Sequence, residues 1–394
     1  MNDFQFEFYN ADSHISAVIF DLDGTILNTE QATKGVLKEF LAKHGKVLDK
    51  EKEDMRLGMT MRESAMAIIK DYDLPLPPDR FIQEIMPMYR EKWVQAKALP
   101  GANRLIMHLH KHEVPFAIAS NSIRDNIDTK ISHQEGWKEF FAVIIGSDQV
   151  KSGKPSPDVF LEAANKMGVD AVCCLVIEDS LVGVKAAKAA GMKVVAVPSI
   201  QRNTDQFSIA DSVLQSLLEF QPELWGLPPF EDWVDNALPV EPFYLRGFYS
   251  DGLLSEFADS GTFALPDQVS GLYFGWAKVD THEMIFKVVV SIGWDHVYYT
   301  AKRKIQLCLV DGSNEDMCDQ QIQLLLVGYI RGLSTEKNIC GAQGNTSSYM
   351  EILEEDQVIA ATSLDLPMFA HHTCVPFFSE ACFEDGSAAS DENE

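Results

Sequence analysis

The 394-residue sequence is poor in basic residues: 33 Lys and Arg stand against 59 Asp and Glu, which gives a net charge of -26. Nucleic acids and anionic membrane surfaces bind basic patches, so this balance argues against either as a partner. The sequence also lacks any run of the ~18 or more apolar residues that a membrane-spanning helix needs. An anionic small molecule would therefore have to be bound by local positive charge, from a metal ion or a few cationic side chains at the site.

Cysteine is scarce too. The seven cysteines are odd in number, are scattered, and show neither a Cys-x-x-Cys pair nor the Cys/His spacing of a metal site. This usage favours reduced thiols in a reducing compartment. Residues 1–14 are acidic, contain no Arg and have no apolar segment, which argues against a transit or signal peptide. We therefore expect a cytoplasmic protein.

The length predicts about two domains, at roughly 150 residues per domain. From residue 15 to about 220, short apolar runs alternate with helical patterns, which is typical of an α/β fold with a doubly wound parallel sheet. Five strands are expected, at 15–20, 115–119, 142–145, 173–177 and 194–197. Residues 31–99 show only helical periodicity, so we expect a helical cap between the first two strands.

The second half of the sequence has a different pattern of predicted secondary structure. Residues 221–245 are rich in proline and are typical of a linker. Strands rich in β-branched and aromatic residues are expected at 271–278, 285–294, 304–310 and 321–330. They predict an all-β module, a sandwich or a small barrel, over residues 246–370, with a closing helix at 349–363. The acidic tail, residues 371–394, is expected to be disordered.

Two carboxylates follow the first strand directly. Asp21 and Asp23 come just before Gly24-Thr25, which ends the strand in a turn. Alternation along an extended chain points both acids to the same side, at the strand end where open α/β sheets bind ligands. Clustered carboxylates repel each other unless a cation lies between them, and oxygen ligands of this kind suit Mg²⁺. The simpler alternative is a pair of helix-capping acids.

Polar residues also follow the next three strands. They are Ser120 and Asn121 after the second strand, Asp148 and Lys154 after the third, and Glu178 and Asp179 after the fourth. Each group has a structural interpretation of its own, as a helix cap or a solvated lysine. Because parallel strands bring their carboxyl ends to one edge of the sheet, the coincidence of four groups favours one ligand site.

Four short strings resemble, in order, the four signatures of the haloacid dehalogenase-like phosphohydrolases over about residues 15–200. They are Phe20-Asp21-Leu22-Asp23-Gly24-Thr25, Ser120-Asn121, Gly153-Lys154-Pro155 and Ile177-Glu178-Asp179-Ser180. The resemblance implies an Mg²⁺-dependent phosphatase in which Asp21 attacks phosphorus, forming an aspartyl-phosphate, and Asp23 transfers the protons.

The same resemblance implies the remaining site residues. The implied phosphate-binding residues are Gly24, Thr25, Ser120, Asn121 and Lys154. The implied metal ligands are Asp21, Asp23 (by its carbonyl), Asp179 and, through water, Glu178. The expected substrate contacts in the cap are Glu30, Gly58, Met59 and Thr60.

The β module resembles plant riboflavin kinase domains. The strings that carry this likeness are Ser270–Ala277, Val290–Trp294, Leu326–Arg331 and Ala361–Pro367. The whole chain then resembles the plant family that joins a riboflavin kinase to an FMN phosphatase, which implies FMN as the phosphatase substrate. The kinase signatures are degenerate, because Gln306 occupies the position of the catalytic Glu and an amide cannot act as a base. The family's Gly-rich phosphate loop and Pro-Thr-Ala-Asn motif are also missing before Gly271.

Three interpretations stay open. The first is an FMN phosphatase with a degenerate kinase domain. The second is a bifunctional enzyme that retains ATP-dependent riboflavin kinase activity. The third is a phosphatase of sugar or glycerol phosphates, whose second domain binds flavin or a partner without chemistry. The apolar, Met-rich cap suits a flat isoalloxazine better than a bare polyol, although apolar cap residues are more often simply core.

Overall fold

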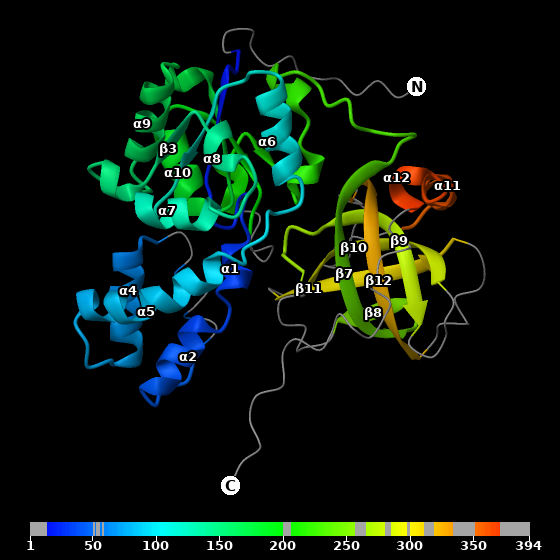
Figure 1. Cartoon of the computed structure of the whole chain (residues 1–394), viewed down its shortest axis with the longest axis horizontal. Coiled ribbons are helices and arrows are strands. Elements are labelled where there is room, and N and C mark those ends of the chain that lie inside the picture. The colour runs from blue at the N-terminus through cyan, green and yellow to red at the C-terminus, as the bar shows by residue number, and fades with distance from the viewer. Residues whose placement is uncertain are drawn as a thin grey trace, which may run out of the picture. The chain divides into compact units, whose positions relative to one another are not determined.

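The computed structural model describes residues 14–49, 52, 56, 59–199, 206–256, 265–279, 285–297, 300–310, 319–333 and 351–370. The chain divides into two compact units, residues 1–230 with 266–268, and residues 231–265 with 269–394. The division falls within the stretch predicted to be a linker. Figure 1 shows the elements of both units.

The first unit is built on a six-stranded parallel sheet with the strand order β3-β2-β1-β4-β5-β6. The strands are β1 (Ala17–Phe20), β2 (Phe116–Ala119), β3 (Val143–Ile145), β4 (Cys174–Glu178), β5 (Lys193–Ala196) and β6 (Ser212–Val213). This confirms the predicted α/β fold with a parallel sheet. The sequence pattern missed β6, because two residues are too short for a periodic signal.

Helices cover both faces of this sheet. They are α6 (Ala102–Lys111), α7 (Arg124–Ile131), α8 (Trp137–Phe140), α9 (Asp158–Met167) and α10 (Leu181–Ala189). Alternation along β1 directs Val18 and Phe20 into the core beneath α6, α7 and α8, whereas Ala17 and Ile19 pack against α9 and α10. Because both faces are buried, the strands are continuously apolar.

The predicted helical cap follows β1. Its helices are α1 (Thr29–Ala32), α2 (Val36–Lys43), α4 (Met61–Tyr72) and α5 (Pro78–Trp93). The cap has an apolar core of its own, in which Phe40 from α2, Ile68 from α4 and Phe81 from α5 are buried together. Figure 1 shows α2, α4 and α5 gathered below the helices and strands of the α/β core.

The two ends of the cap are held together by backbone pairing. Leu27 and Ala98 form an isolated antiparallel bridge. The amide of Asn28 donates to the carbonyl of Lys97, and the amide of Leu99 donates to the carbonyl of Ile26, both at 2.9 Å. The cap therefore leaves the core and returns to it at one point, directly after Asp23.

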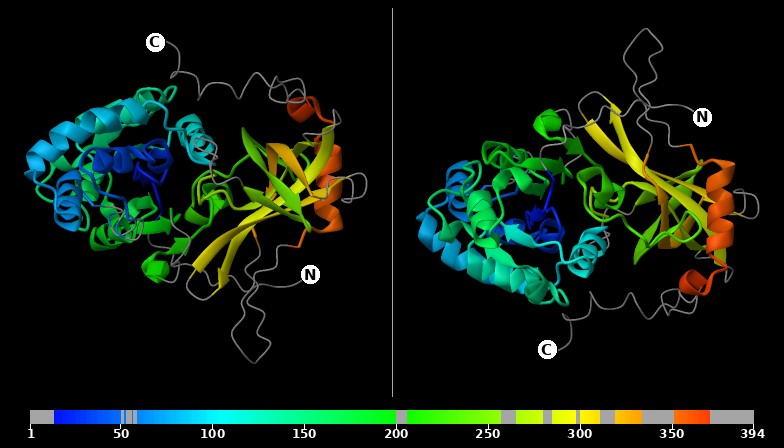
Figure 2. Two further views of the ribbon diagram at one scale, coloured as in Figure 1. Left: turned by 90° about the horizontal axis from the view of Figure 1, so that it is seen from below. Right: turned by 90° about the horizontal axis from the view of Figure 1, so that it is seen from above.

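The second unit is a closed barrel with the strand order β10-β11-β8-β7-β12-β9. The strands are β7 (Leu238–Ser250), β8 (Leu253–Glu256), β9 (Gly271–Val279), β10 (Ile285–Val297), β11 (Thr300–Leu309) and β12 (Gln320–Arg331). Neighbouring strands pair antiparallel. Helix α11 (Glu354–Ser363) packs Ala360 against the barrel, and α12 (Pro367–Ala370) follows it (Figure 2). Of the two predicted all-β architectures, the barrel is the one observed.

The predicted linker needs a correction. Residues 238–245 do not connect the units but form the first part of β7, whereas Pro222–Trp225 is a short 3₁₀ helix. The prolines favoured a linker in the sequence prediction, because proline cannot donate to a sheet ladder. They are tolerated here because, among the described residues, this part of β7 pairs only with β12, while β8 joins β7 from Gly247 onward.

None of the helices in the described ranges combines the length and the apolar character needed to cross a membrane.

Candidate active site

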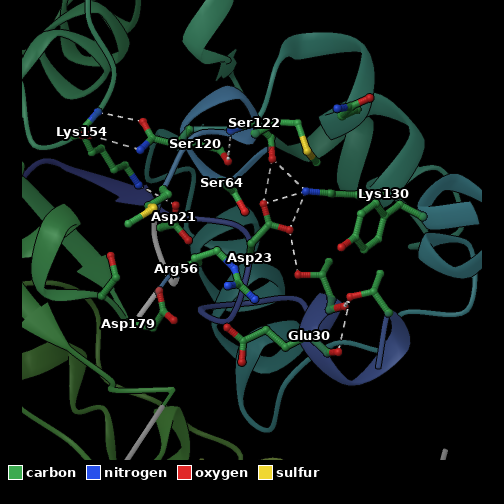
Figure 3. A pocket seen from close by; sticks show the side chains of 18 of the residues that line it. Asp21, Asp23, Glu30, Arg56, Ser64, Ser120, Ser122, Lys130, Lys154 and Asp179 are labelled. Carbon is green, nitrogen blue, oxygen red and sulfur yellow. Dashed lines mark hydrogen bonds and ion pairs between the residues drawn. The ribbon is translucent and has the colours of Figure 1, made fainter. Parts of the chain in front are cut away.

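The carboxyl ends of four parallel strands open into a pocket of about 220 Å³. Asp21 and Asp23 follow β1, Ser120 follows β2, and Glu178 ends β4. Lys154 reaches the same place from the loop after β3, and the cap helices line the other side (Figure 3). The convergence predicted from the order of the strands is therefore present in the fold.

Asp21 lies in a buried ion-pair cluster at the base of this pocket. The ammonium of Lys154 donates to Asp21 Oδ1 at 2.5 Å and to Glu178 Oε1 at 2.7 Å. The other oxygen of Glu178 accepts from the amide and the hydroxyl of Ser180. All three charged side chains are less than 10% exposed. One buried lysine thus orients the first carboxylate while its own position is fixed by the second.

Thr25 ties Asp21 to Asp179. Its hydroxyl lies 3.1 Å from Asp21 Oδ2 and 3.1 Å from Asp179 Oδ1. The neighbouring Gly24 has a φ of +81°, and a Cβ there would lie 2.4 Å from Asp179 Oδ2. Only glycine therefore allows this turn to approach Asp179 so closely. Neither Gly24 nor Thr25 lines the pocket, so their place is beneath the two carboxylates.

The carboxylates in this cluster outnumber the cations. Burial, opposed by Lys154 and helped by the charges of Glu178 and Asp23, raises the pKa of Asp21 to about 7. Burial and the charges of Glu178 and Asp21 also raise the pKa of Asp179 well above its ordinary value. Such raised values mean that the ionised acids lack compensating positive charge. The donor set therefore fits a hard divalent cation.

Within the described ranges, no three side chains of His, Cys, Asp or Glu already surround one point as metal ligands do. Asp21 and Asp179 share the hydroxyl of Thr25 and would be the carboxylates that hold a cation, because Glu178 is committed to Lys154 and Ser180. The side chain of Asp23 is committed elsewhere. The expectation that Asp23 would contribute through its backbone carbonyl is compatible with this arrangement.

Asp23 is paired with Lys130 of α7. The ammonium donates to both carboxylate oxygens, at 2.7 and 2.8 Å, and to Ser122 Oγ at 2.8 Å. Thr29 at the start of the cap also donates to Asp23, at 2.7 Å. Burial alone would raise the pKa of Asp23, but Lys130 and these hydrogen bonds outweigh it and lower the pKa. Asp23 is thus held as a carboxylate.

Some predicted site residues have structural roles. Ser120 and Asn121 both line the pocket, and both ends of the Asn121 amide bind the backbone of Lys154, so Asn121 also positions the lysine loop. Thr60 does not line the pocket, because it forms a capping box with Glu63 at the start of α4. Glu30 and Met59 do line it. Gly58 lies outside the described residues.

Several residues that line the pocket were not predicted from the sequence. They are Thr29, Thr33, Arg56, Met61, Ser64, Tyr89, Trp93, Ser122, Asn126, Lys130 and Ser180. Lys130 had a detectable signal, since it lies on the same face of α7 as Ile127 and Ile131, at helical spacing. A lysine on an apolar face needs a buried acidic partner. Asp23 is that partner.

Gln306, the predicted degenerate kinase position, is an exposed residue of β11, opposite Ser291 of β10. It belongs to the barrel and has no place in the pocket of the first unit.

Two family profiles match the chain. The haloacid dehalogenase-like hydrolase family matches residues 18–197, and the riboflavin kinase family matches residues 259–339. The chain is 42% identical over 380 residues to a bifunctional riboflavin kinase/FMN phosphatase from Arabidopsis thaliana, covering 93% of this chain and 97% of that protein.

Two shorter relatives match about half of the chain. (DL)-Glycerol-3-phosphatase 2 from Arabidopsis thaliana is 38% identical over 225 residues, covering 55% of this chain and 94% of its own length. A probable pseudouridine-5'-phosphatase from Drosophila melanogaster is 36% identical over 223 residues, covering 55% and 96%. The phosphatases thus align with a region about as long as the first unit.

Proposed function

Because the chain belongs to the family of bifunctional riboflavin kinase/FMN phosphatases, we propose that its first unit is an Mg²⁺-dependent phosphatase that converts FMN to riboflavin and phosphate. The proposal rests on the observation that one pocket holds two aspartates whose pKa values are shifted in opposite directions. Asp21 faces Lys154 and Asp179, whereas Asp23, two residues on, faces Lys130.

Asp21 is the nucleophile in this mechanism. Its carboxylate oxygen forms a bond to phosphorus as the bond from phosphorus to the substrate's ester oxygen breaks, which gives an aspartyl-phosphate. Mg²⁺ held by Asp21 and Asp179 would neutralise the repulsion between this carboxylate and the phosphate dianion. Lys154 keeps the attacking oxygen in place, and Ser120 offers its hydroxyl to the phosphoryl oxygens.

Asp23 transfers the protons. It gives a proton to the departing alcohol oxygen and later takes one from the water that cleaves the aspartyl-phosphate. Lys130 keeps Asp23 ionised in the free enzyme, which is the form that the second step requires. The phosphate dianion brings negative charge next to Asp23, so we expect substrate binding to favour the uptake of the proton that the first step requires.

The test is phosphate and riboflavin release from FMN in the presence and absence of Mg²⁺, with the purified full-length chain and its Asp21→Asn variant. We expect release that depends on Mg²⁺, is lost with chelator and falls by at least about 10³ in Asp21→Asn, because an amide is not a nucleophile toward phosphorus. Turnover of the variant near the wild-type rate would overturn the assignment of Asp21.

A smaller substrate is the second candidate. The pocket volume of about 220 Å³ lies below the ~300–1,000 Å³ of sites that enclose drug-sized ligands. This favours a compact polyol phosphate such as glycerol 3-phosphate, on which a relative is named to act. Comparing kcat/KM for FMN, glycerol 3-phosphate and pseudouridine 5'-phosphate decides between the candidates. Fast release from either small substrate with none from FMN would exclude FMN.

We further propose that the barrel unit does not phosphorylate riboflavin. Gln306 offers an amide where a carboxylate base is needed, and removal of a general base costs about 10²–10⁴ in rate. The assay should use full-length Asp21→Asn with ATP, Mg²⁺ and riboflavin, because an active phosphatase would destroy FMN as it formed. Accumulation of FMN would show that the chain is bifunctional.

A further inference from the structure

Arg56 is a cap residue that no motif explains. It lies in a turn between α2 and α4, lines the pocket and is only 8% exposed. Figure 3 shows its guanidinium among the labelled side chains of Asp23, Glu30 and Ser64, with no interaction drawn to any of them. A charged group that is nine-tenths buried is thus directed toward the space that a substrate would occupy.

The two terminal nitrogens of this guanidinium lack hydrogen-bond partners among the described residues. Neither Nη1 nor Nη2 of Arg56 has an acceptor, although both atoms are buried. Within the described part of the chain, Arg56 forms a single, long ion pair, with 3.6 Å between Nη1 and Asp71 Oδ2. Leaving a buried charged donor unsatisfied costs more than the ~1–3 kcal/mol of a neutral group. Hydrogen-bond acceptors on a molecule bound in the pocket would relieve this cost.

The other two cations of the pocket are fully engaged. Lys154 bonds Asp21 and Glu178, and Lys130 bonds Asp23 and Ser122. Among the described pocket residues, Arg56 is thus the cation that can still receive a ligand. It belongs to the cap, on the side of Asp23, which serves the leaving group rather than the phosphorus atom.

The charge of the lining decides what kind of acceptor fits. The pocket has five carboxylates, on Asp21, Asp23, Glu30, Glu178 and Asp179, and three cations. The Mg²⁺ proposed above offsets this surplus of acids, but the bound phosphate dianion restores a net negative charge, so a second anionic group on the substrate would still be repelled. A hydroxyl group, in contrast, can accept from Arg56 and donate to a carboxylate of the same lining.

Building on the phosphatase function proposed above, we propose that Arg56 determines specificity by binding the hydroxyl oxygens of the substrate's alcohol part, on the carbons next to the phosphate ester. The enzyme would select phosphate esters of polyhydroxylated chains, of which the ribityl chain of FMN is one. Arg56 contributes two parallel donors, which match two neighbouring oxygens better than a lysine could.

The test compares two substrates that differ only in these hydroxyls: FMN, and its analogue with an unsubstituted pentyl phosphate chain in place of ribityl phosphate. The variants are Arg56→Met, which keeps the length of the side chain but has no donors, and Arg56→Lys. The control is Asp71→Asn, which removes the ion pair and leaves Arg56 in the pocket.

We expect Arg56→Met to lower kcat/KM for FMN by about 10- to 150-fold, the range for one hydrogen bond to a charged group. The same variant should change kcat/KM for the pentyl analogue by less than about threefold. Arg56→Lys should lie between Arg56→Met and the wild type with FMN. Riboflavin, as product, should inhibit Arg56→Met more weakly than the wild type, and Asp71→Asn should behave as the wild type throughout.

Equal losses with both substrates would overturn the proposal, because they would show that Arg56 acts on the phosphoryl group or on the fold. An unchanged kcat/KM for FMN would overturn it as well, and so would an effect of Asp71→Asn as large as that of Arg56→Met. Failure of the phosphatase proposal is a separate outcome, since the wild type would then hydrolyse neither substrate. If Arg56→Met does not fold, the ratio of the two substrates in Arg56→Lys decides the matter in the same way.

Discussion

The pair of Asp23 and Lys130 can be tested by a double-mutant cycle. Lys130 is 4% exposed, and its ammonium is bound to both oxygens of Asp23 and to Ser122. On its other side lies the ring of Trp93, 4.5 Å from the ammonium nitrogen. The perturbation is Lys130→Met, alone and combined with Asp23→Asn, measured against the wild type.

The magnitude follows from the geometry. At 2.7–2.8 Å and an effective dielectric constant of about 20, the Coulomb attraction is at most about 6 kcal/mol. Breaking a fully buried pair typically costs 3–5 kcal/mol in stability, and we expect less here because the Asp23 side chain is 30% exposed. For the rate, Asp23→Asn removes the acid/base group, which costs about 10²–10⁴. Lys130→Met leaves that group present but unoriented, so we expect a loss of about 10–10².

The cycle is measured as kcat/KM for FMN hydrolysis at saturating Mg²⁺. If Lys130 acts through Asp23, the double variant will be no slower than Asp23→Asn, and the coupling free energy will equal the whole effect of Lys130→Met, about 1.4–2.8 kcal/mol. The double variant should also resist urea better than Lys130→Met, because it buries no unpaired carboxylate. The exposed Lys138, changed to Met, is the matched control. Additive losses would refute the reasoning.

Three further variants test other parts of the first unit. Lys154→Met should abolish phosphate release and lower the free energy of unfolding by about 3–5 kcal/mol, because it leaves two buried carboxylates without their cation. The exposed Lys151→Met should do neither. Glu219→Gln should stabilise the fold at pH 8 and not at pH 4: burial raises the pKa of Glu219 from 4.5 to about 7, so the wild type loses stability as the pH rises across that interval. Urea titrations at the two pH values should show a difference of about 1–2 kcal/mol, less than the full shift implies because the side chain is only partly buried; equal midpoints would contradict it. Gly183→Ala should slow FMN hydrolysis at least tenfold, because the new Cβ would lie 1.5 Å from Glu178 Oε1 and displace that carboxylate from Lys154; an unchanged rate would mean that Glu178 does not set the position of Lys154.

The sequence could predict the part of the site that depends on strand order. Asp21, Lys154 and Asp179 each follow a parallel strand, and parallel strands deliver their ends to one edge whatever the details of packing. The fold class was predictable for the same reason, since alternating strands and helices leave few topologies open. These inferences need only periodicity, which is local.

The parts that could not be predicted depend on tertiary packing. Arg56 and Trp93 enter the pocket because of how the cap folds against itself, and no spacing along the chain encodes that. Thr60 illustrates the reverse error. A Thr followed three residues later by Glu is a capping box, and this local pattern explains Thr60 without any substrate. Likewise, β7 contains prolines that are tolerated only where a neighbouring strand does not need their amides.

The clamp formed by Leu27 and Ala98 makes the cap exchangeable. An insertion whose ends are already paired to each other can be replaced without moving the strands on either side, because its two ends join the core through one short backbone ladder. Asp21, Lys154 and Asp179 lie on the core side of that ladder, and Arg56 lies beyond it. A cap transplanted from another phosphatase at these two residues would bring its own leaving-group contacts and leave Asp21, Lys154 and Asp179 in place, but it would have to supply a substitute for Thr29, which binds Asp23. Chemistry and selectivity are, in this fold, separately replaceable parts.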